Sequence, residues 1–174
     1  NTAYIVMNYI AGQPLNTYLE KQGGALEYKQ VTKIINPLIP PLSKVHKEMI
    51  FHRDISPDNM FITEAGQVVL IDFGAAKNAF VKYTQSMQFV VKDGFSPVEQ
   101  YLSDGEIGPW TDIYALGATI YFLLTGNTPT QSLERMSDDA LTLPSQLGVD
   151  IPTQAETALM QALSIQPENR FQDI

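Results

Sequence analysis

Two carboxylates and one carboxamide in the middle of the chain have the types and spacing of side chains that share one reaction. Asp54 and Asn59 lie in the segment 52–59, which reads HRDISPDN, and Asp72 begins the triplet DFG thirteen residues after Asn59. Carboxylate and carboxamide oxygens are ligands that Mg²⁺ prefers, and a carboxylate can accept the proton of a hydroxyl group. These three residues could therefore hold a metal-bound nucleotide and position an incoming hydroxyl group at one place.

The chain between Asn59 and Asp72 has the pattern of a β-hairpin. Two apolar runs in residues 60–71 are separated by the turn-forming residues 64–67, as in two strands joined by a short turn. A hairpin brings its two ends together. We therefore expect Asn59 and Asp72 at one edge of a small sheet, where both could contact one cation.

Composition and charge narrow the class of protein. A chain of 174 residues, 44% of them hydrophobic, is long enough for one domain with its own core. No apolar stretch reaches the roughly 18 residues of a membrane-spanning helix, so we expect no membrane segment in this chain. The net charge of −8 argues against a nucleic-acid partner, and the absence of cysteine agrees with a cytoplasmic location.

The remaining pattern predicts a mostly helical chain around the hairpin. Residues 26–47 have apolar positions at a helical period, but three prolines between positions 37 and 41 interrupt the backbone hydrogen bonds, so we expect a kinked or divided helix. Residues 113–125 are apolar on nearly every side, which is typical of a helix buried in the centre of a domain. A last helix is expected from Thr153, with Glu156 completing a capping box.

Further motifs follow one another in a fixed order along the chain. They are residues 4–12 (YIVMNYIAG), 97–99 (PVE), 112–117 (DIYALG) and 167–170 (PENR). Together with HRDISPDN and DFG, this set resembles the C-terminal lobe of a eukaryotic-like (Hanks-type) protein serine/threonine kinase of the kind found in bacteria.

The resemblance implies an α+β kinase fold that is mostly α with a small β-hairpin in the part covered here. It places residues 1–7 in the last strand of the N-terminal lobe, residues 8–12 in the hinge and residues 13–174 in a C-terminal lobe that stops before the last helix of the family. The N-terminal lobe is then largely absent.

Such a kinase transfers the γ-phosphate of ATP to a Ser or Thr hydroxyl of a protein substrate, with Mg²⁺ as cofactor. The implied partners are ATP, a protein substrate and the missing N-terminal lobe of the same polypeptide. That lobe carries the Gly-rich loop and the lysine that hold the phosphates. We therefore expect residues 1–174 to be inactive on their own.

The resemblance also assigns roles in the reaction. Asp54 would orient the hydroxyl and accept its proton, while Asn59 and Asp72 would hold the magnesium ions. The residues expected to contact the nucleotide lie around the hinge and the hairpin: Met7, Asn8, Ile10, Leu15, Phe61 and Ile71. For Leu15 and Phe61, ordinary core packing would give the same pattern.

A second group of residues has implied structural or regulatory roles: His52, Arg53, Phe73, Gly74, Glu99, Asp112 and Arg170. His52 and Phe73 would pack in an internal hydrophobic stack. Glu99 and Arg170 would form a buried ion pair, and Asp112 would anchor the catalytic loop through backbone N–H groups.

Arg53 has two open interpretations. Its planar guanidinium could bind a phosphate on the activation segment, residues 72–99, or it could form a structural pair with a nearby carboxylate or carbonyl. Thr84 and Ser86 lie near the middle of that segment and are candidate phosphosites, although an ordinary solvated hydroxyl is the preferred interpretation of each.

Three departures from the family pattern weaken these assignments. Ser56 stands where such kinases usually have a lysine that neutralises the transferring phosphate, and Lys92 stands where they have a threonine. The motif at 97–99 is also an imperfect A-P-E. Another cation could replace the missing one, and the candidates are Lys77, Lys82 and Lys92.

Two other functions remain open at this stage. A pseudokinase that docks partners would explain Ser56, Lys92 and the missing N-terminal lobe. A small-molecule phosphotransferase of the aminoglycoside or choline type would share a similar catalytic loop and the aspartate after the hairpin. Arg53 and Arg170 favour the protein-kinase branch over this second alternative.

Overall fold

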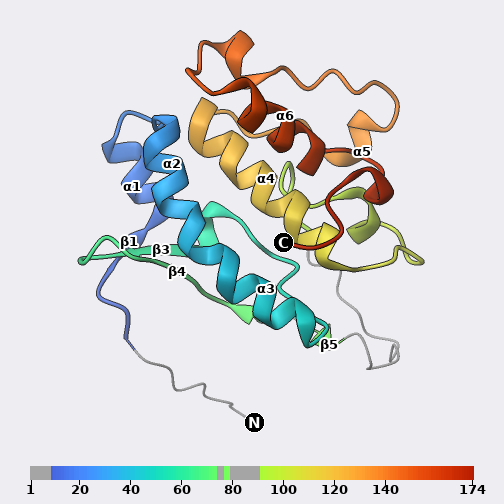
Figure 1. The fold of residues 1–174 in the computed structure, drawn as a ribbon, viewed down its shortest axis with the longest axis horizontal. Coiled ribbons are helices and arrows are strands. Elements are labelled where there is room, and N and C mark those ends of the chain that lie inside the picture. Colours follow the sequence, from blue (N-terminus) through green and yellow to red (C-terminus); the bar gives the residue numbers. More distant parts are fainter. Residues whose placement is uncertain (1–8, 74–76, 79–90) are drawn as a thin grey trace.

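The helix α4 (Pro109–Thr125) occupies the centre of the structure. In the computed structural model, which describes residues 9–73, 77–78 and 91–174, α4 runs between the helices α2 and α3 on one side and α6 on the other (Figure 1). Twelve of its 17 residues are buried. The buried helix predicted over residues 113–125 is therefore confirmed, and it begins earlier, at Pro109. None of the described helices is long and apolar enough to cross a membrane.

The remaining elements are short. The other α-helices are α1 (Leu15–Lys21), α2 (Tyr28–Ile35), α3 (Ile39–Lys47), α5 (Ser132–Arg135) and α6 (Thr153–Ala162). The 3₁₀ turns are η1 (Asn36–Leu38), η2 (Pro57–Asn59), η4 (Val98–Gln100), η5 (Pro144–Leu147) and η6 (Pro167–Asn169). The strands are β1 (Gly12–Pro14), β2 (Ile50–Phe51), β3 (Met60–Thr63), β4 (Val68–Leu70) and β5 (Lys77–Asn78).

The helix predicted over residues 26–47 is divided, as its prolines require. Helix α2 ends at Ile35, the turn η1 follows, and α3 begins at Ile39. Pro40 and Pro41 lie in the first turn of α3. Because backbone amides in a first turn have no acceptor within the helix, these two prolines remove no helical hydrogen bond.

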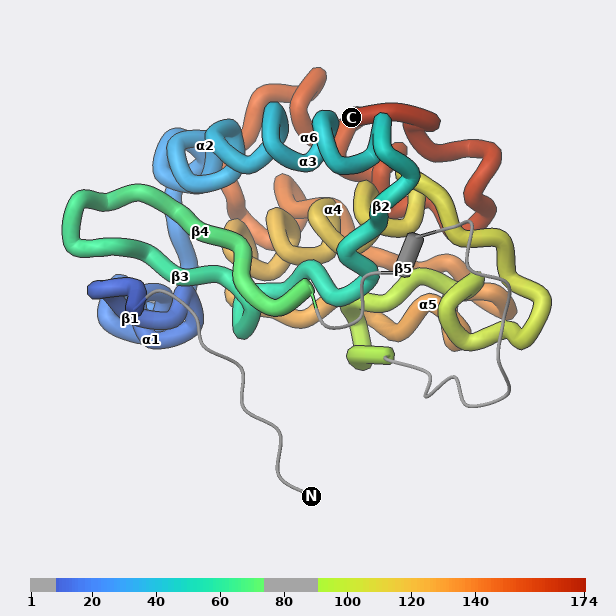
Figure 2. Tube along the Cα trace, turned by 90° about the horizontal axis from the view of Figure 1, so that it is seen from below, coloured from blue at the N-terminus to red at the C-terminus, as the bar shows by residue number. Residues whose placement is uncertain are grey.

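The predicted hairpin is present, and a third strand joins it. Strand β3 pairs antiparallel with β4, with Met60 opposite Leu70 and Ile62 opposite Val68. Strand β1 pairs with the other edge of β3, which gives the order β1-β3-β4 (Figure 2). The sequence interpretation treated residues 8–12 as the hinge and did not predict β1. Three residues that include a glycine and a proline show no alternation of their own, so the pairing depends on the free edge of β3.

A second, smaller sheet lies just before the candidate catalytic loop. Strand β2 pairs antiparallel with β5, with Ile50 opposite Asn78 and Phe51 opposite Lys77. The pairing returns the chain that follows the DFG triplet to the segment that precedes HRDISPDN. It was not predicted, since two-residue strands have no readable periodicity.

Helix α6 begins at Thr153, but the predicted capping box is wrong. Its N-cap residue is Pro152, and no side chain bonds to the free amides of the first turn. The carboxylate of Glu156 instead accepts hydrogen bonds from the Ser145 backbone N–H at 2.7 Å and from the Ser145 hydroxyl at 2.9 Å. The Glu156 carboxylate therefore bonds to the preceding turn η5 and does not cap the first turn of α6.

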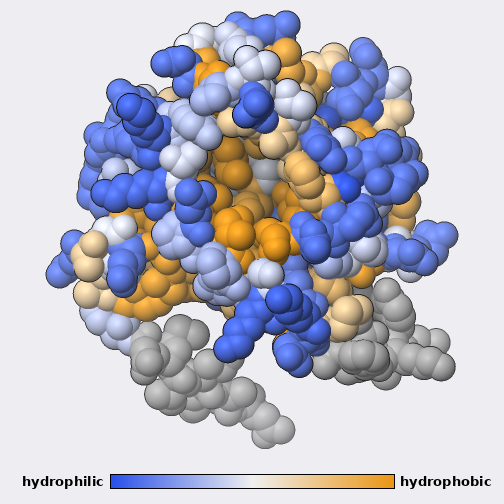
Figure 3. Space-filling model, in the orientation of Figure 1, coloured by the Kyte–Doolittle hydropathy of each residue, from blue (hydrophilic) through white to orange (hydrophobic). Residues whose placement is uncertain are grey.

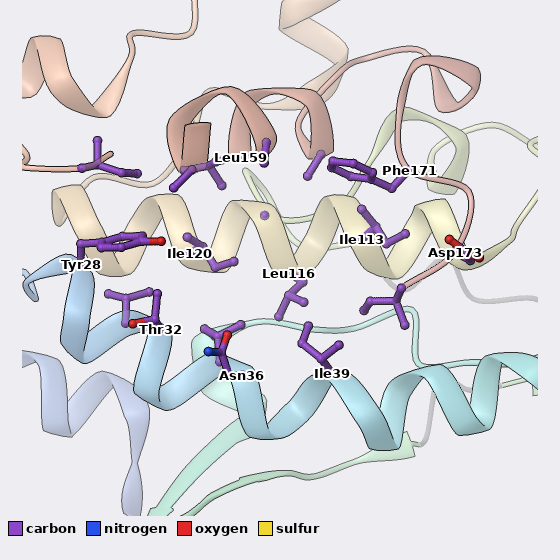
Figure 4. Close-up of a pocket in the computed structure, with 18 residues that line it drawn as sticks. Tyr28, Thr32, Asn36, Ile39, Ile113, Leu116, Ile120, Leu159, Phe171 and Asp173 are labelled. Carbon is purple, nitrogen blue, oxygen red and sulfur yellow. The ribbon is translucent and has the colours of Figure 1, made fainter. Parts of the chain in front are cut away.

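An apolar pocket opens on the face seen in Figure 3, where hydrophobic side chains line a hollow near the centre of the view. Figure 4 shows that Leu116 and Ile120 of α4 form its middle, with Tyr28 of α2 and Leu159 of α6 on opposite sides. None of the residues that line the pocket is a predicted site residue. The candidate reaction site therefore lies elsewhere, on the loop between β2 and β3.

We predict that Leu123→Ala destabilises the fold strongly. Leu123 has 0% exposed surface in the core, and removing its side chain leaves a cavity that should lower the free energy of unfolding by about 2–5 kcal/mol. The matched control is Leu133→Ala, because Leu133 is 40% exposed and should change stability by less than about 0.5 kcal/mol. Urea unfolding followed by circular dichroism measures both, and equal losses would contradict the assignment of α4 to the core.

Candidate active site

One carboxylate ties the loop that carries the candidate catalytic residues to the start of α4. Asp112, which is fully buried, accepts the backbone N–H of His52 at Oδ2 and that of Arg53 at Oδ1, both at 2.8 Å. His46 Nε2, in the last turn of α3, lies 2.8 Å from Asp112 Oδ2. The contact expected between Asp112 and the loop amides is thus present, and the loop is held through its backbone.

Arg53 occupies a strained backbone conformation directly before Asp54. Its φ of 67° lies in the left-handed region, which costs a non-glycine residue of order 1–3 kcal/mol and persists only where the surroundings impose it. Here the Arg53 N–H donates to Asp112 and its carbonyl accepts a bond from Gln100 Nε2 at 2.8 Å. These two bonds hold the turn, and they therefore also fix the backbone position of Asp54.

Asp54 and Asn59 are in direct contact. Asn59 Nδ2 donates to Asp54 Oδ2 at 2.7 Å and to the Asp54 carbonyl oxygen at 2.8 Å. The turn η2 produces this contact because it folds the chain back, with the Asn59 N–H donating to the Ser56 carbonyl at 3.0 Å. The two bonds use both amide hydrogens of Asn59 and leave its Oδ1 as the atom that can bind a cation.

The hairpin brings Asp72 next to Asn59 at the level of the backbone. The Ile71 N–H donates to the Asn59 carbonyl at 2.8 Å, and Asp72 follows with an exposed side chain and a left-handed φ of 62°. No group of three or more His, Cys, Asp or Glu side chains that could hold a metal occurs in the described part of the chain. A cation bound by Asn59 and Asp72 would therefore take its other ligands from a phosphate or from water.

His52 has a packing role in this arrangement. Its ring is fully buried and lies 4.5 Å from the ring of Phe73, at an angle of 57°. Its Nδ1 accepts the Asp54 N–H at 3.3 Å, and its Nε2 lies 3.1 Å from the Ile71 carbonyl oxygen. Both ring nitrogens therefore contact backbone, which agrees with the expected stack and leaves neither free to act as a base.

A lysine from a distant segment reaches the candidate catalytic loop. The Lys92 ammonium donates to Ser56 Oγ at 3.1 Å and forms an ion pair with Asp58. In Figure 2 the chain from residue 91 resumes below α4, on the side where the segment between β2 and β3 also runs. Burial lowers the pKa of Lys92, and the nearby Asp54 carboxylate raises it in part.

The expected ion pair between Glu99 and Arg170 is present and buried. Arg170 donates to both carboxylate oxygens of Glu99, from Nη1 at 2.7 Å and from Nη2 at 3.1 Å. Thr111 Oγ1 donates to the same carboxylate at 3.0 Å, and the guanidinium carbon lies 4.8 Å from the centre of the Tyr114 ring. The pair joins the segment after Lys92 to α4 and to the C-terminal residues.

The predicted nucleotide-binding residues differ in their exposure to solvent. Leu15 has 0% exposed surface and belongs to the core, so core packing, the other interpretation, accounts for its position, and its contact with the nucleotide stays a prediction. Phe61 is partly exposed and alternates on β3 with the buried Met60 and Ile62, so it lies on the face of the strand turned away from the core. Ile10 and Ile71 are also partly exposed.

Six predicted residues lie outside the described residues: Met7, Asn8, Gly74, Lys82, Thr84 and Ser86. Their roles stay predictions.

The sequence interpretation missed two buried residues with basic side chains. His46 contacts Asp112, and Arg135 donates to the Tyr114 hydroxyl at 3.1 Å, to the Leu163 carbonyl at 2.9 Å and to Asp139 at 2.8 Å. A histidine in the last turn of a helix and an arginine in a short polar stretch usually face water. No local pattern marks either residue, because their partners come from distant segments.

We predict that Glu99→Gln destabilises the domain by about 3–5 kcal/mol, because it leaves the buried Arg170 guanidinium without its anion. Glu168→Gln is the control: Glu168 is exposed, and its loss should change the free energy of unfolding by less than about 0.5 kcal/mol. Chemical denaturation of the two variants gives the comparison. A Glu99→Gln variant as stable as the control would show that the ion pair has no structural weight.

Comparisons with known proteins agree with this geometry. The sequence model of the protein kinase domain matches residues 1–171. A probable serine/threonine-protein kinase of Clostridium perfringens is 32% identical over 180 residues, covering 97% of this chain and 25% of that protein. Serine/threonine-protein kinase PknA of a Nostoc species is 32% identical over 175 residues, covering 97% of this chain and 30% of its own. Tyrosine-protein kinase MasK of Myxococcus xanthus is 31% identical, covering 97% of this chain and 29% of its own.

A solved structure, the apo form of PpkA-294, superposes with a TM-score of 0.80 at 32% sequence identity, covering 95% of this chain and 58% of that one. The chain spans 25% to 30% of the length of the three kinases compared above. The helices and the small antiparallel sheet described here are thus those of a protein kinase fold. Because the family match extends over nearly every residue and includes the loop anchored by Asp112, the chain belongs to the protein kinase domain family.

Proposed function

We propose that this chain is the hinge and C-terminal lobe of a bacterial protein kinase, which transfers the γ-phosphate of ATP to a Ser or Thr hydroxyl of a protein substrate. The observation that carries the proposal is the contact between Asp54 and Asn59, beside the end of the hairpin that presents Asp72. One carboxylate is oriented by a carboxamide, and a second carboxylate, that of Asp72, lies two residues after β4, the strand paired with β3. This is the arrangement that phosphoryl transfer requires.

Asp54 is the proposed proton acceptor. The oxygen of the substrate hydroxyl forms a bond to the γ-phosphorus while the bond from that phosphorus to the bridging oxygen breaks. The electron pair of the broken bond stays with ADP, and the hydroxyl proton passes to the Asp54 carboxylate. The Asn59 amide holds Asp54 Oδ2 at 2.7 Å, so the other carboxylate oxygen is the one that faces the hydroxyl.

Asn59 and Asp72 are the proposed ligands of Mg²⁺. The Asn59 Oδ1 and the Asp72 carboxylate are hard oxygen donors that fit this ion, and Asn59 is oriented for the task because its amide hydrogens are bound to Asp54. When bound, Mg²⁺ neutralises charge on the phosphate oxygens. The chain itself positions these donors through the hairpin and through the left-handed turn at Asp72.

The nucleotide is proposed to lie against the outer face of β3, with its adenine on Phe61 and bonded to the backbone of Asn8 and Ile10. Met7 would line the rear of that site, and Ile71 would close it near the phosphates. The N-terminal lobe of the same polypeptide would cover the nucleotide from the other side. Residues 1–174 alone should therefore bind ATP weakly and transfer little phosphate.

The choice of a Ser or Thr hydroxyl is part of the proposal. PknA and the Clostridium perfringens protein are named serine/threonine kinases, whereas MasK is named a tyrosine kinase. The balance of names favours Ser/Thr. A cytoplasmic location of the domain follows from the same proposal, because ATP and most protein substrates of such kinases are there.

Arg53 is proposed to sense phosphorylation. Its Nε is buried and has no hydrogen-bond partner among the described residues, so the guanidinium has a vacant donor close to the catalytic loop. A phosphate on Thr84 or Ser86 would offer the acceptor oxygens that a guanidinium binds best.

We predict that Asp54→Ala lowers kcat of the full-length protein by about 10²–10⁴-fold, the usual loss for a general base, with little change in thermal stability. The control Asp104→Ala removes an exposed carboxylate and should leave kcat within about twofold. Transfer of labelled phosphate from Mg·ATP to a general protein substrate measures both variants. Asp54→Ala activity within tenfold of wild type would contradict the proposed role, and tight Mg·ATP binding without any transfer by the wild type would indicate a pseudokinase.

A further inference from the structure

We propose that Lys92 supplies the positive charge that faces the transferring phosphoryl group, from outside the catalytic loop, in place of a cation that the loop itself lacks at Ser56. The inference rests on the proposed kinase function and assigns to it a further catalytic residue.

The reaction requires such a cation. In phosphoryl transfer, charge spreads over the three outer oxygens of the γ-phosphate and develops on the leaving oxygen, and fixed positive groups lower the barrier. Within segment 52–59 the basic residues are His52 and Arg53. Both ring nitrogens of His52 contact backbone, and the buried Arg53 Nε has no hydrogen-bond partner among the described residues. Ser56, two residues after Asp54, is neutral and fully buried.

Lys92 places an ammonium at that position. Its Nζ donates to Ser56 Oγ at 3.1 Å, and the Asp54 carboxylate is close enough to act on its charge. Among the described basic residues, only Lys92 has a hydrogen bond to a side chain of the segment between Asp54 and Asn59. The ammonium therefore lies against Ser56, two residues after the proposed base and within range of its charge, where a phosphoryl group in transit to a bound hydroxyl would pass.

The backbone around Lys92 is rigid enough to present this charge. The Lys92 N–H donates to Ser96 Oγ at 2.8 Å, and the Lys92 carbonyl accepts the N–H groups of Phe95 and Ser96 at 2.9 Å each. The Ser96 carbonyl accepts a bond from the buried Ser132 hydroxyl at 2.8 Å. The Lys92 ammonium also lies 5.8 Å from the centre of the Phe95 ring. The turn 92–96 thus holds the base of the side chain while its tip crosses to the loop.

The present partner of the ammonium can be exchanged for a phosphate. The side chains of Lys92 and Asp58 are 31% and 52% exposed, and ion pairs exposed to this extent contribute little stability, about 0–1 kcal/mol. A phosphate oxygen brought in by the nucleotide can therefore compete with Asp58 for the ammonium.

In the transfer step, Lys92 forms and breaks no covalent bond. The γ-phosphorus gains its bond to the substrate oxygen and loses its bond to ADP, the electron pair remains on ADP, and the proton goes to Asp54. The Lys92 ammonium keeps its protons throughout and offsets the negative charge of the phosphoryl oxygens.

The first test replaces the charge in the full-length protein. We expect Lys92→Gln to lower kcat and kcat/KM together by about 10–100-fold, somewhat less than the loss for a fully enclosed donor, and Lys92→Arg to retain most of the activity. The control Lys44→Gln removes an equal charge from the exposed surface of α3 and should leave kcat within about twofold. A Lys92→Gln variant within threefold of wild type, with melting unchanged, would overturn the proposal.

The pH dependence gives an independent readout. Since burial lowers the pKa of Lys92, wild-type kcat should fall at alkaline pH as the ammonium loses its proton, earlier than for an ordinary lysine. An arginine stays charged there, so Lys92→Arg should remove this alkaline limb. An unchanged limb in the arginine variant would count against Lys92.

A reciprocal exchange distinguishes a direct role of Lys92 in phosphoryl transfer from a role in holding Asp58 in place. Lys92→Thr alone should lose activity like Lys92→Gln, and Ser56→Lys added to it should restore kcat to within about tenfold of wild type, because the cation returns from the other side of the same contact. Asp58→Asn keeps the ammonium but removes its ion pair. If Lys92 only held Asp58 in place, Asp58→Asn would reproduce the loss of Lys92→Gln and the double variant would stay inactive, which would overturn the proposal.

The experiments distinguish failure of the proposed kinase function from failure of the Lys92 assignment. If wild-type protein transferred no phosphate from Mg·ATP, or if Asp54→Ala had no effect, the proposed function would fall and the role of Lys92 with it. If Asp54→Ala abolished transfer while the Lys92 variants did not, the kinase function would stand and only the assignment of Lys92 would be overturned.

Discussion

The carboxylate of Asp112 joins the buried centre of the molecule to the loop that carries the candidate catalytic residues. Two backbone N–H groups of the loop and the ring of His46 meet on this one side chain. Because α4 is packed on nearly every side, the carboxylate has a fixed position, and the loop takes its own position from it. The strained turn at Arg53, and with it the direction of Asp54, depends on this anchor.

A second buried carboxylate, that of Glu99, holds another segment of the site in place. The ion pair of Glu99 and Arg170 fixes the segment that follows Lys92 by bonding it to the C-terminal residues near α4. A buried pair of this kind adds little net stability by itself but is costly to break. The loop that carries Asp54 and the turn that carries Lys92 are therefore both held in place relative to α4. This is why two segments far apart in sequence can meet within hydrogen-bond distance.

Ser56 and Lys92 both depart from the family pattern. When only the sequence is considered, the two departures together favour the pseudokinase alternative. In the structure the two positions are in contact. Relative to the family pattern, the cation and the small hydroxyl stand on opposite sides of one contact, and the charge of the Lys92 ammonium is felt by Asp54. The same contact weakens the case for a pseudokinase, because it places a positive charge on the loop that carries the proposed base, where phosphoryl transfer requires one.

The sequence by itself determined the local features: the hairpin, the division of α2 from α3 at the prolines, the buried character of α4, and the motif order that identifies the family. These follow from periodicity and backbone chemistry, which act over a few residues. Tertiary structure alone decided the third strand β1, the burial of Leu15, the loss of the predicted cap at Glu156 and the contact between Lys92 and Ser56. Each of these depends on a partner more than ten residues away, and the free energy of such a contact is set by packing that no local pattern records.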